Sequence, residues 1–245
     1  MRNSILKLVL VAAVAFAGPL CAEEKYVPEE GSVELAKKKR KGKSDRAIDP
    51  ALPNVLIIGD SISMGYTGTV KAELASKANV FHNAGNSQGT TNGLAKIDEW
   101  LAVADWDVIH FNFGLHDLKR VTEAGTSNNS NDPNDPYQAN VETYAANLKK
   151  IVTQLRGAGA NLIFATTTPF PSGVKPFRAP GDAGNYNAAA LKIMRKNNIE
   201  VNDLYTLVLP DLATLQKPAN VHFDKAGSEL MGKQVAGRIE AALAE

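Results

Sequence analysis

The sequence predicts an α/β fold of three layers, in which a five-stranded parallel sheet lies between two layers of helices. Two observations lead to this prediction. Short apolar runs alternate with longer stretches of helical periodicity throughout residues 54–245, and this alternation produces parallel strands joined by crossover helices. The first run, 55–58, contains no polar residue, as expected of a strand that is buried on both faces.

The predicted elements follow one another in regular order. We expect strands at residues 55–58, 80–83, 108–113, 162–166 and 199–202, and helices at residues 63–77, 93–103, 137–157, 185–197 and 225–243. Two long segments have neither the apolar run of a strand nor the periodicity of a helix. Residues 121–136 are rich in Asn, Asp, Gly and Ser, and residues 167–184 contain four prolines. Because loops of this length in a compact domain are usually functional or disordered, we expect both to border a substrate cleft.

The composition suits one α/β domain preceded by an N-terminal tail. The chain has 245 residues, a formal net charge of +1 and 44% hydrophobic residues, which is enough to bury a sizeable core. The tail divides in two by composition. Residues 1–22 carry basic residues and then an apolar run, whereas residues 23–53 are charged and contain almost nothing to bury. We therefore expect a signal segment, a linker, and a domain at residues 54–245.

Residues 1–22 have the pattern of a secretory signal peptide. An apolar run at residues 8–17 follows the basic residues, and Ala22 ends the segment. The run is too short for a stable membrane anchor, so we expect cleavage after Ala22 and a periplasmic or secreted protein. Cys21 leaves lipidation open, although Leu20 fits poorly the small residue expected before a lipidated cysteine. Since Cys21 is the only cysteine, the cleaved protein would have no disulfide and no thiolate.

A basic run between Lys37 and Arg46 marks the expected linker at residues 23–53. A segment this polar is expected to be disordered or at most partly helical. We favour a solvated linker, with electrostatic contact to a polyanion such as a sulfated glycan as the functional alternative. Nucleic acid is not an expected partner, because the domain shows no basic pattern with interleaved aromatic residues.

The first predicted strand ends abruptly at Gly59-Asp60-Ser61. A helical pattern begins soon after it, so Ser61 is expected at a strand-to-helix turn on the carboxyl edge of the sheet, where α/β proteins hold their sites. The unpaired backbone N–H groups of a helix start can bind an oxyanion there. Ser61 is therefore a candidate nucleophile, and an N-cap role for Ser61 or Ser63 is the structural alternative.

Three later segments also lie at strand ends or just before the last helix. They are residues 81–85, residues 107–117, which end in Gly114-Leu115-His116-Asp117, and residues 218–222, which end in His222. Together with Gly59-Asp60-Ser61, these segments resemble the four blocks of the SGNH (GDSL-type) hydrolases, a family of serine esterases and lipases. The resemblance covers residues 54–245 and implies the flavodoxin-like α/β/α fold of that family.

The resemblance implies a role for each matching residue. Ser61 would be the nucleophile and His222 the general base. The backbone N–H groups of Ser61 and Gly85 would hold the oxyanion. The resemblance further implies a secreted carboxylic ester hydrolase that removes short acyl groups, acetyl in particular, from an acylated glycan or small ester, with no cofactor and no metal.

Two positions depart from the family pattern. His116 stands where the family has the Asn that gives the oxyanion a third hydrogen bond, and Ala219 stands where it has the Asp that orients the base. A histidine N–H can replace the amide donor, so His116 is the candidate third donor. Two candidates remain open for orienting the base, Asn220 and Asp224.

These departures leave two other functions to weigh. One is a carbohydrate-binding protein on an esterase fold with weakened catalysis, since a fold alone does not establish function. The other is a metal-dependent phosphoesterase, because Gly114-Leu115-His116-Asp117 resembles the Gly-Asn-His-Asp of calcineurin-like metallophosphoesterases, with Asp60 and His222 as further ligands. The early Asp-x-His and the late Gly-x-His of that family are missing here. The other two histidines, His82 and His110, are expected to be buried rather than catalytic.

Overall fold

The structure, a computed structural model, describes residues 48–244. The predicted signal peptide with Cys21 and the basic run between Lys37 and Arg46 lie outside the described residues. Just ahead of the predicted domain start, the backbones of Asp49 and Leu52 are hydrogen-bonded to the side chain of Asn79, which ties this lead-in to the sheet. None of the described helices is long and apolar enough to cross a membrane.

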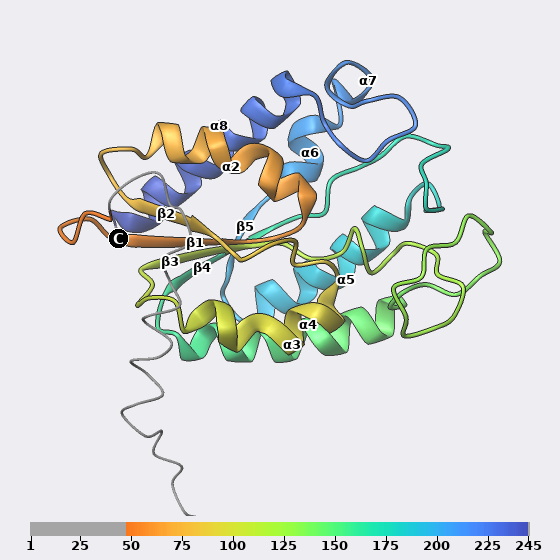
Figure 1. The fold of residues 1–245 in the computed structure, drawn as a ribbon, viewed down its shortest axis with the longest axis horizontal. Coiled ribbons are helices and arrows are strands. Elements are labelled where there is room, and N and C mark those ends of the chain that lie inside the picture. Colours follow the sequence, from red (N-terminus) through yellow and green to blue (C-terminus); the bar gives the residue numbers. More distant parts are fainter. Residues whose placement is uncertain (1–47, 245) are drawn as a thin grey trace, which may run out of the picture. The chain divides into compact units, whose positions relative to one another are not determined.

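Five parallel strands form one sheet, as predicted (Figure 1). They are β1 (Asn54–Ile58), β2 (Asn79–His82), β3 (Val108–Phe111), β4 (Asn161–Ala165) and β5 (Glu200–Asn202). Their order is β2-β1-β3-β4-β5, which is the flavodoxin-like order. Successive strands are added toward one edge of the sheet up to β2 and toward the other edge from β3 on, so the switch point lies between β1 and β3. Ile57 is in register with His82 on one side and with His110 on the other, so these three strands end side by side.

Helices cover both faces of the sheet, which confirms the three-layer prediction (Figure 1). One face carries α2 (Ser61–Glu73) and α8 (Lys225–Leu243), and the other carries α3 (Thr90–Leu101), α4 (Val141–Gly157) and α5 (Asp182–Lys196). Two short helices, α6 (Leu204–Val208) and α7 (Leu212–Leu215), follow β5. Neither was predicted from the sequence, because an element of about one turn is too short to show a periodicity.

The long elements match the predicted ones, with differences of a few residues at their ends. The helix predicted from residue 137 begins at Val141, because Asn140 is its N-cap and accepts a hydrogen bond from the N–H of Thr143 at 2.9 Å. Tyr137 pairs instead with Arg120 in an isolated bridge. A side-chain cap, rather than hydrophobic periodicity, therefore sets where α4 begins.

The hydrophobic core lies on both faces of the two central strands. Val55, Ile57 and Ile58 of β1 have no exposed surface, and neither do Val108 and Ile109 of β3. Because side chains cover both faces of these strands, a ligand can reach the sheet only at the carboxyl ends of the strands and the loops that follow them. The candidate site residues lie on those loops.

Candidate active site

Ser61 is the first residue of α2 and lies three residues beyond the end of β1. The N-cap of the helix is Asp60, whose Oδ1 accepts a hydrogen bond from the N–H of Ile62 at 2.9 Å. The backbone N–H of Ser61 has no hydrogen-bond partner among the described residues. The capping role therefore falls to Asp60, and the N–H of Ser61 stays available to a ligand.

His222 lies in the loop between α7 and α8, and its side chain meets Ser61. The distance from His222 Nε2 to Ser61 Oγ is 2.9 Å, although the two residues are 161 positions apart in sequence. On the other side of the ring, His222 Nδ1 lies 2.8 Å from Asn220 Oδ1. The backbone N–H of His222 donates to the same oxygen at 2.9 Å, which fixes the orientation of the Asn220 amide.

These contacts assign the tautomer of His222. An amide oxygen only accepts hydrogen bonds, so the ring proton must reside on Nδ1. Nε2 then carries the lone pair and accepts the hydroxyl proton of Ser61. The arrangement is that of a nucleophile, a base and a group that orients the base.

The two candidates for orienting His222 separate in the structure. Asn220 contacts the ring, whereas Asp224 is the N-cap of α8 and accepts a hydrogen bond from the N–H of Gly227 at 2.8 Å. Ala219, at the position of the family's Asp, has a positive φ of 48°, which is uncommon for a residue other than glycine. The geometry therefore favours Asn220, with Asp224 serving the start of the helix.

Gly85 lies on the loop after β2, exposed and with a positive φ of 71°. Asn83, which is only 4% exposed, links this loop to the loop that carries Ser61. Its Oδ1 accepts from the N–H of Gly59 at 2.9 Å, and its Nδ2 donates to the carbonyl of Gly85 at 3.0 Å. This role of Asn83 was not predicted from the sequence. The available signal was a polar residue at the end of a predicted strand, two positions before Gly85.

His116 is half-buried on the loop after β3, and its ring has no hydrogen bond to any described residue. Burial lowers its pKa to about 3, with smaller contributions from the charges of Lys119, Arg178 and His222. His116 is therefore neutral at physiological pH, and a neutral imidazole carries one N–H donor. The influence of His222 on its pKa indicates that the two rings lie within electrostatic range of each other.

Gly114 and Asp117, which flank His116, have structural roles. Gly114 has a φ of 144°, and a Cβ there would lie 2.2 Å from Thr167 Oγ1, so no other residue fits this turn. Asp117 is buried and accepts hydrogen bonds at the start of α3 from the N–H of Thr90, at 2.8 Å, and from its hydroxyl. Among the described residues, no group of three or more His, Cys, Asp or Glu side chains is placed to hold a metal ion.

Ser63 and His82 form a second serine–histidine contact, but a buried one. Ser63 is only 2% exposed, and its Oγ lies 2.7 Å from His82 Nε2 and 2.7 Å from the carbonyl of Asp60. His82 Nδ1 lies 2.8 Å from the carbonyl of Asn83. Because a substrate has no access to a hydroxyl enclosed in this way, this pair joins β2 to α2 and is not a second active site.

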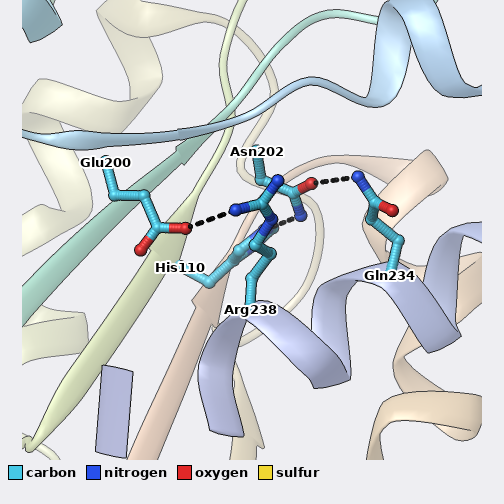
Figure 2. A network of polar contacts seen from close by, with 5 residues as sticks. All are labelled: His110, Glu200, Asn202, Gln234 and Arg238. Carbon is cyan, nitrogen blue, oxygen red and sulfur yellow. Dashed lines mark hydrogen bonds and ion pairs between the residues drawn. The ribbon is translucent and has the colours of Figure 1, made fainter. Parts of the chain in front are cut away.

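His110 is the last but one residue of β3 and is fully buried. His110 Nε2 accepts a hydrogen bond from Asn202 Nδ2 at 3.2 Å, and Asn202 Oδ1 accepts one from Gln234 of α8 at 3.2 Å (Figure 2). Beside this network, Arg238 of α8 pairs with Glu200 of β5. The burial of His110 holds its pKa at about 3. The network therefore joins β3 and β5 to α8 through a neutral histidine.

The surroundings of His222 favour its neutral form. Partial desolvation of the ring lowers its pKa below 6.5, and the charges of Lys217 and Arg178 lower it further. The imidazole is then unprotonated at neutral pH, as a general base must be. Beside the dyad is a small cavity of about 50 Å³, lined by Ile62, Phe223 and Met231 together with Ser61 and His222.

The chain matches the model of the GDSL-like Lipase/Acylhydrolase family over residues 57–230. It belongs to this family. The residues of the Ser61–His222 contact both lie within the matched range. As a family member the protein is a carboxylic ester hydrolase, which agrees with the resemblance noted in the sequence. A search of curated proteins gives no significant match.

Solved structures of other family members share the fold of this GDSL-like hydrolase at low sequence identity. A lipase/acylhydrolase from Enterococcus faecalis is 20% identical, with a TM-score of 0.64 over 78% of this chain and 96% of that one. A GDSL-like lipase from Bacteroides thetaiotaomicron is 15% identical, with a TM-score of 0.64 over 86% and 98%. A catalytic mutant of an acetylxylan esterase from Geobacillus stearothermophilus is 16% identical, with a TM-score of 0.62 over 76% and 94%.

Proposed function

We propose that this family member is a serine esterase that works through a Ser61–His222 dyad positioned by Asn220. One observation carries the proposal: an unbroken hydrogen-bonded line from Ser61 Oγ to His222 Nε2, at 2.9 Å, and from His222 Nδ1 to Asn220 Oδ1, at 2.8 Å. A hydroxyl is a weak nucleophile unless a base takes its proton, and the line supplies that base in the required tautomer.

The reaction has two halves, and His222 handles the proton in both. His222 Nε2 takes the proton of Ser61 Oγ as the oxygen attacks the ester carbonyl carbon. The tetrahedral intermediate expels the alcohol, which receives the proton from the imidazolium, and the acyl group remains on Ser61. Water then gives a proton to Nε2 and attacks the acyl carbon. The bond between the acyl carbon and Ser61 Oγ breaks, Oγ takes the proton back from the imidazolium, and the acid is released. Asn220 keeps the ring proton on Nδ1 throughout.

The oxyanion of each tetrahedral intermediate needs hydrogen-bond donors that are in place before the reaction. The N–H of Ser61 is one donor and the N–H of Gly85 is the second, since neither has a hydrogen-bond partner among the described residues. His116 is the proposed third donor, through the N–H of its neutral ring. Asn83 positions the Gly85 loop relative to the Ser61 loop through its two hydrogen bonds.

Short acyl groups, acetyl in particular, are the proposed substrates. The cavity of about 50 Å³ beside Ser61 supports this, because its volume suits a small acyl group. The similarity to an acetylxylan esterase supports acetyl esters of a polysaccharide as the substrate class. Export to the periplasm or the medium, proposed from the pattern of residues 1–22, would bring the enzyme to such a polymer.

The test combines turnover with covalent labelling. The purified protein should hydrolyse 4-nitrophenyl acetate faster than the octanoate, and a fluorophosphonate probe should label it. Ser61→Ala should abolish both the hydrolysis and the labelling, because it removes the attacking oxygen. Ser63→Ala is the matched control from the same helical turn. It should still be labelled, since Ser63 is buried against His82.

Two outcomes would contradict the proposal. Labelling that persists in Ser61→Ala would place the nucleophile elsewhere. A folded wild-type protein that binds acetylated glycans without turnover or labelling would indicate a binding protein on an esterase fold.

A further inference from the structure

Arg178 is a buried cation next to the proposed catalytic residues. Only 5% of its surface is exposed. Its Nε donates to the carbonyl of Leu115 at 2.9 Å, and its Nη1 donates to the carbonyl of Pro176 at 3.1 Å. Since Leu115 directly precedes His116, the first bond holds the guanidinium against the loop that carries the proposed third oxyanion donor.

Arg178 has no ion-pair partner in the part of the chain that the structure describes. Its remaining nitrogen, Nη2, has no hydrogen-bond partner in that part of the chain and is not sealed from solvent. Burial lowers its pKa to about 10, so Arg178 is still a cation at neutral pH. Burying an unpaired charge is costly, and such groups are typical of functional sites.

The charge of Arg178 acts on the site from close by. It lowers the pKa of both His116 and His222. Lys119 acts on His116 and Lys217 acts on His222 in the same direction, and no carboxylate contributes to either shift. The acid that does interact with Arg178 is Asp60, which is too far away for an ion pair. The charges of Arg178, Lys119 and Lys217 therefore favour the neutral forms of these two rings.

We propose that Arg178 binds an anionic group of the substrate, a carboxylate or a sulfate, close to the ester that Ser61 attacks. The inference rests on the proposed esterase function and narrows the substrate to acylated acidic glycans. A guanidinium suits both anions, since its planar N–H donors hydrogen-bond to carboxylate and sulfate oxygens with the added strength of charge. A neutral sugar would leave Nη2 of Arg178 without such a partner.

A matched set of three acetylated sugars tests the proposal on the wild-type protein. The set is a methyl glucuronide, a methyl glucoside and a methyl glucoside 6-sulfate, each with one acetyl group at the same position. We expect kcat/KM for one or both anionic sugars to exceed that for the neutral glucoside by on the order of 10- to 100-fold, the range of a charge-assisted hydrogen bond. Which anionic sugar is preferred identifies the anion. Added salt should reduce the preference.

Variants of Arg178 then assign the preference to this side chain. Arg178→Gln keeps an N–H donor and removes the charge, so the ratio of anionic to neutral kcat/KM should fall close to one. Arg178→Lys keeps the charge and should retain part of the ratio. Arg238→Gln is the control, because Arg238 lies on α8 beside Glu200 and should leave the ratio unchanged.

The outcomes separate this inference from the proposed function. Equal turnover of all three sugars by the wild type would overturn the role of Arg178 and leave the esterase intact. A full preference that survives in folded Arg178→Gln would overturn it as well. If Arg178→Gln does not fold, competitive inhibition of the wild type decides: inhibition by glucuronate or glucose 6-sulfate well above that by glucose supports the proposal, and equal inhibition refutes it. Failure to hydrolyse any ester, 4-nitrophenyl acetate included, would refute the proposed function instead.

Discussion

Asn220 Oδ1 lies 2.8 Å from His222 Nδ1 and also accepts the backbone N–H of His222 at 2.9 Å. One oxygen thus sets both the position of the loop and the orientation of the ring. The acceptor is a neutral amide, where the resemblance leads one to expect a carboxylate at position 219. An amide fixes the tautomer as well as a carboxylate does, but it stabilises the imidazolium less during the reaction.

The first prediction concerns Asn220. Asn220→Ala should lower kcat on 4-nitrophenyl acetate by on the order of 100-fold, the scale of a poorly positioned general base. Asn220→Asp should retain or raise kcat, because a carboxylate accepts the same proton and adds a charge-assisted bond to the imidazolium. Thermal unfolding should be measured alongside kcat, since the loop bond to His222 is lost in the alanine variant. Full activity in folded Asn220→Ala would show that another group orients the base.

The second prediction concerns His116. If its ring donates to the oxyanion, His116→Ala should lower kcat by on the order of 10²–10³, the usual effect of losing one such donor. His116→Asn places an amide donor on the same loop and should retain much more activity than the alanine variant. Since the pKa of His116 is near 3, neither variant should change the acid limb of the pH profile through this residue. Wild-type activity in His116→Ala would show that His116 is not an oxyanion donor and that the backbone N–H groups of Ser61 and Gly85 are the only two.

The third prediction is a pH dependence. His222 must be neutral to act as a base, and its pKa lies below 6.5, through desolvation first and then the charge of Lys217. The kcat/KM of the wild type should therefore fall only at a pH below 6.5. Lys217→Gln removes a positive neighbour, so the pKa of His222 should rise and the acid limb should move to higher pH.

Lys225→Gln is the matched control for this shift. Lys225 is an exposed lysine at the start of α8 that pairs with Glu229, and it is not among the charges that act on His222. Its removal should leave the acid limb in place. A limb that stays unmoved in Lys217→Gln at low salt would show that the charge of Lys217 is screened from His222.

The fourth prediction concerns stability and Asp117. Burial raises the pKa of Asp117 from 3.8 to about 7, although hydrogen bonds from Thr90 oppose the rise. Its contribution to stability is therefore fully present below pH 3.8 and is lost as the pH rises through 7, by up to roughly 4 kcal/mol. Asp117→Asn cannot ionise, and its Oδ1 can still accept from Thr90. Its Tm relative to the wild type should rise between pH 5 and pH 9.

Asp203 provides a control of opposite sign. Burial raises its pKa, but the hydrogen bonds from Thr206, Thr166 and Tyr205 outweigh burial, so the net pKa is lowered. Its contribution to stability is present above the unfolded pKa and is lost as the pH falls. Asp203→Asn should therefore be less stable than the wild type at neutral pH, and the difference should shrink in acid. A parallel response of Asp117→Asn and Asp203→Asn to pH would contradict this account of both groups.

Local sequence was enough to predict most of the fold. An unbroken apolar run makes a strand buried on both faces, a 3.6-residue repeat makes a helix, and their alternation makes a parallel sheet. The Gly59-Asp60-Ser61 turn followed for the same reason, since the strand pattern stops there and the helical pattern starts close by. Helix starts were less accurate, because a single cap such as Asn140 decides them and hydrophobic periodicity does not detect a cap.

The partners of the site were decided by the tertiary structure. Asn220 and Asp224 are both two residues from His222, and sequence distance did not separate them. The carboxylate of Asp224 accepts a hydrogen bond from the N–H of Gly227 at the start of α8, whereas Asn220 contacts the ring of His222. Asn83 was missed because its two hydrogen bonds matter only once β1 and β2 lie side by side.

What the sequence determined by itself is therefore the succession of strands and helices along the chain, the turn that carries Ser61 and the family. What only the tertiary structure decided is which side chains come together at the site: His222 contacts Ser61 from 161 residues away, and Arg178, on the loop after β4, contacts the loop that carries His116. The physical reason is that periodicity and capping are contacts between neighbours in the chain, whereas a site forms from loops that a parallel sheet brings to one edge. The charge of Arg178 at the site is visible only in three dimensions, because its burial, and the absence of an ion pair with any carboxylate in residues 48–244, depend on packing.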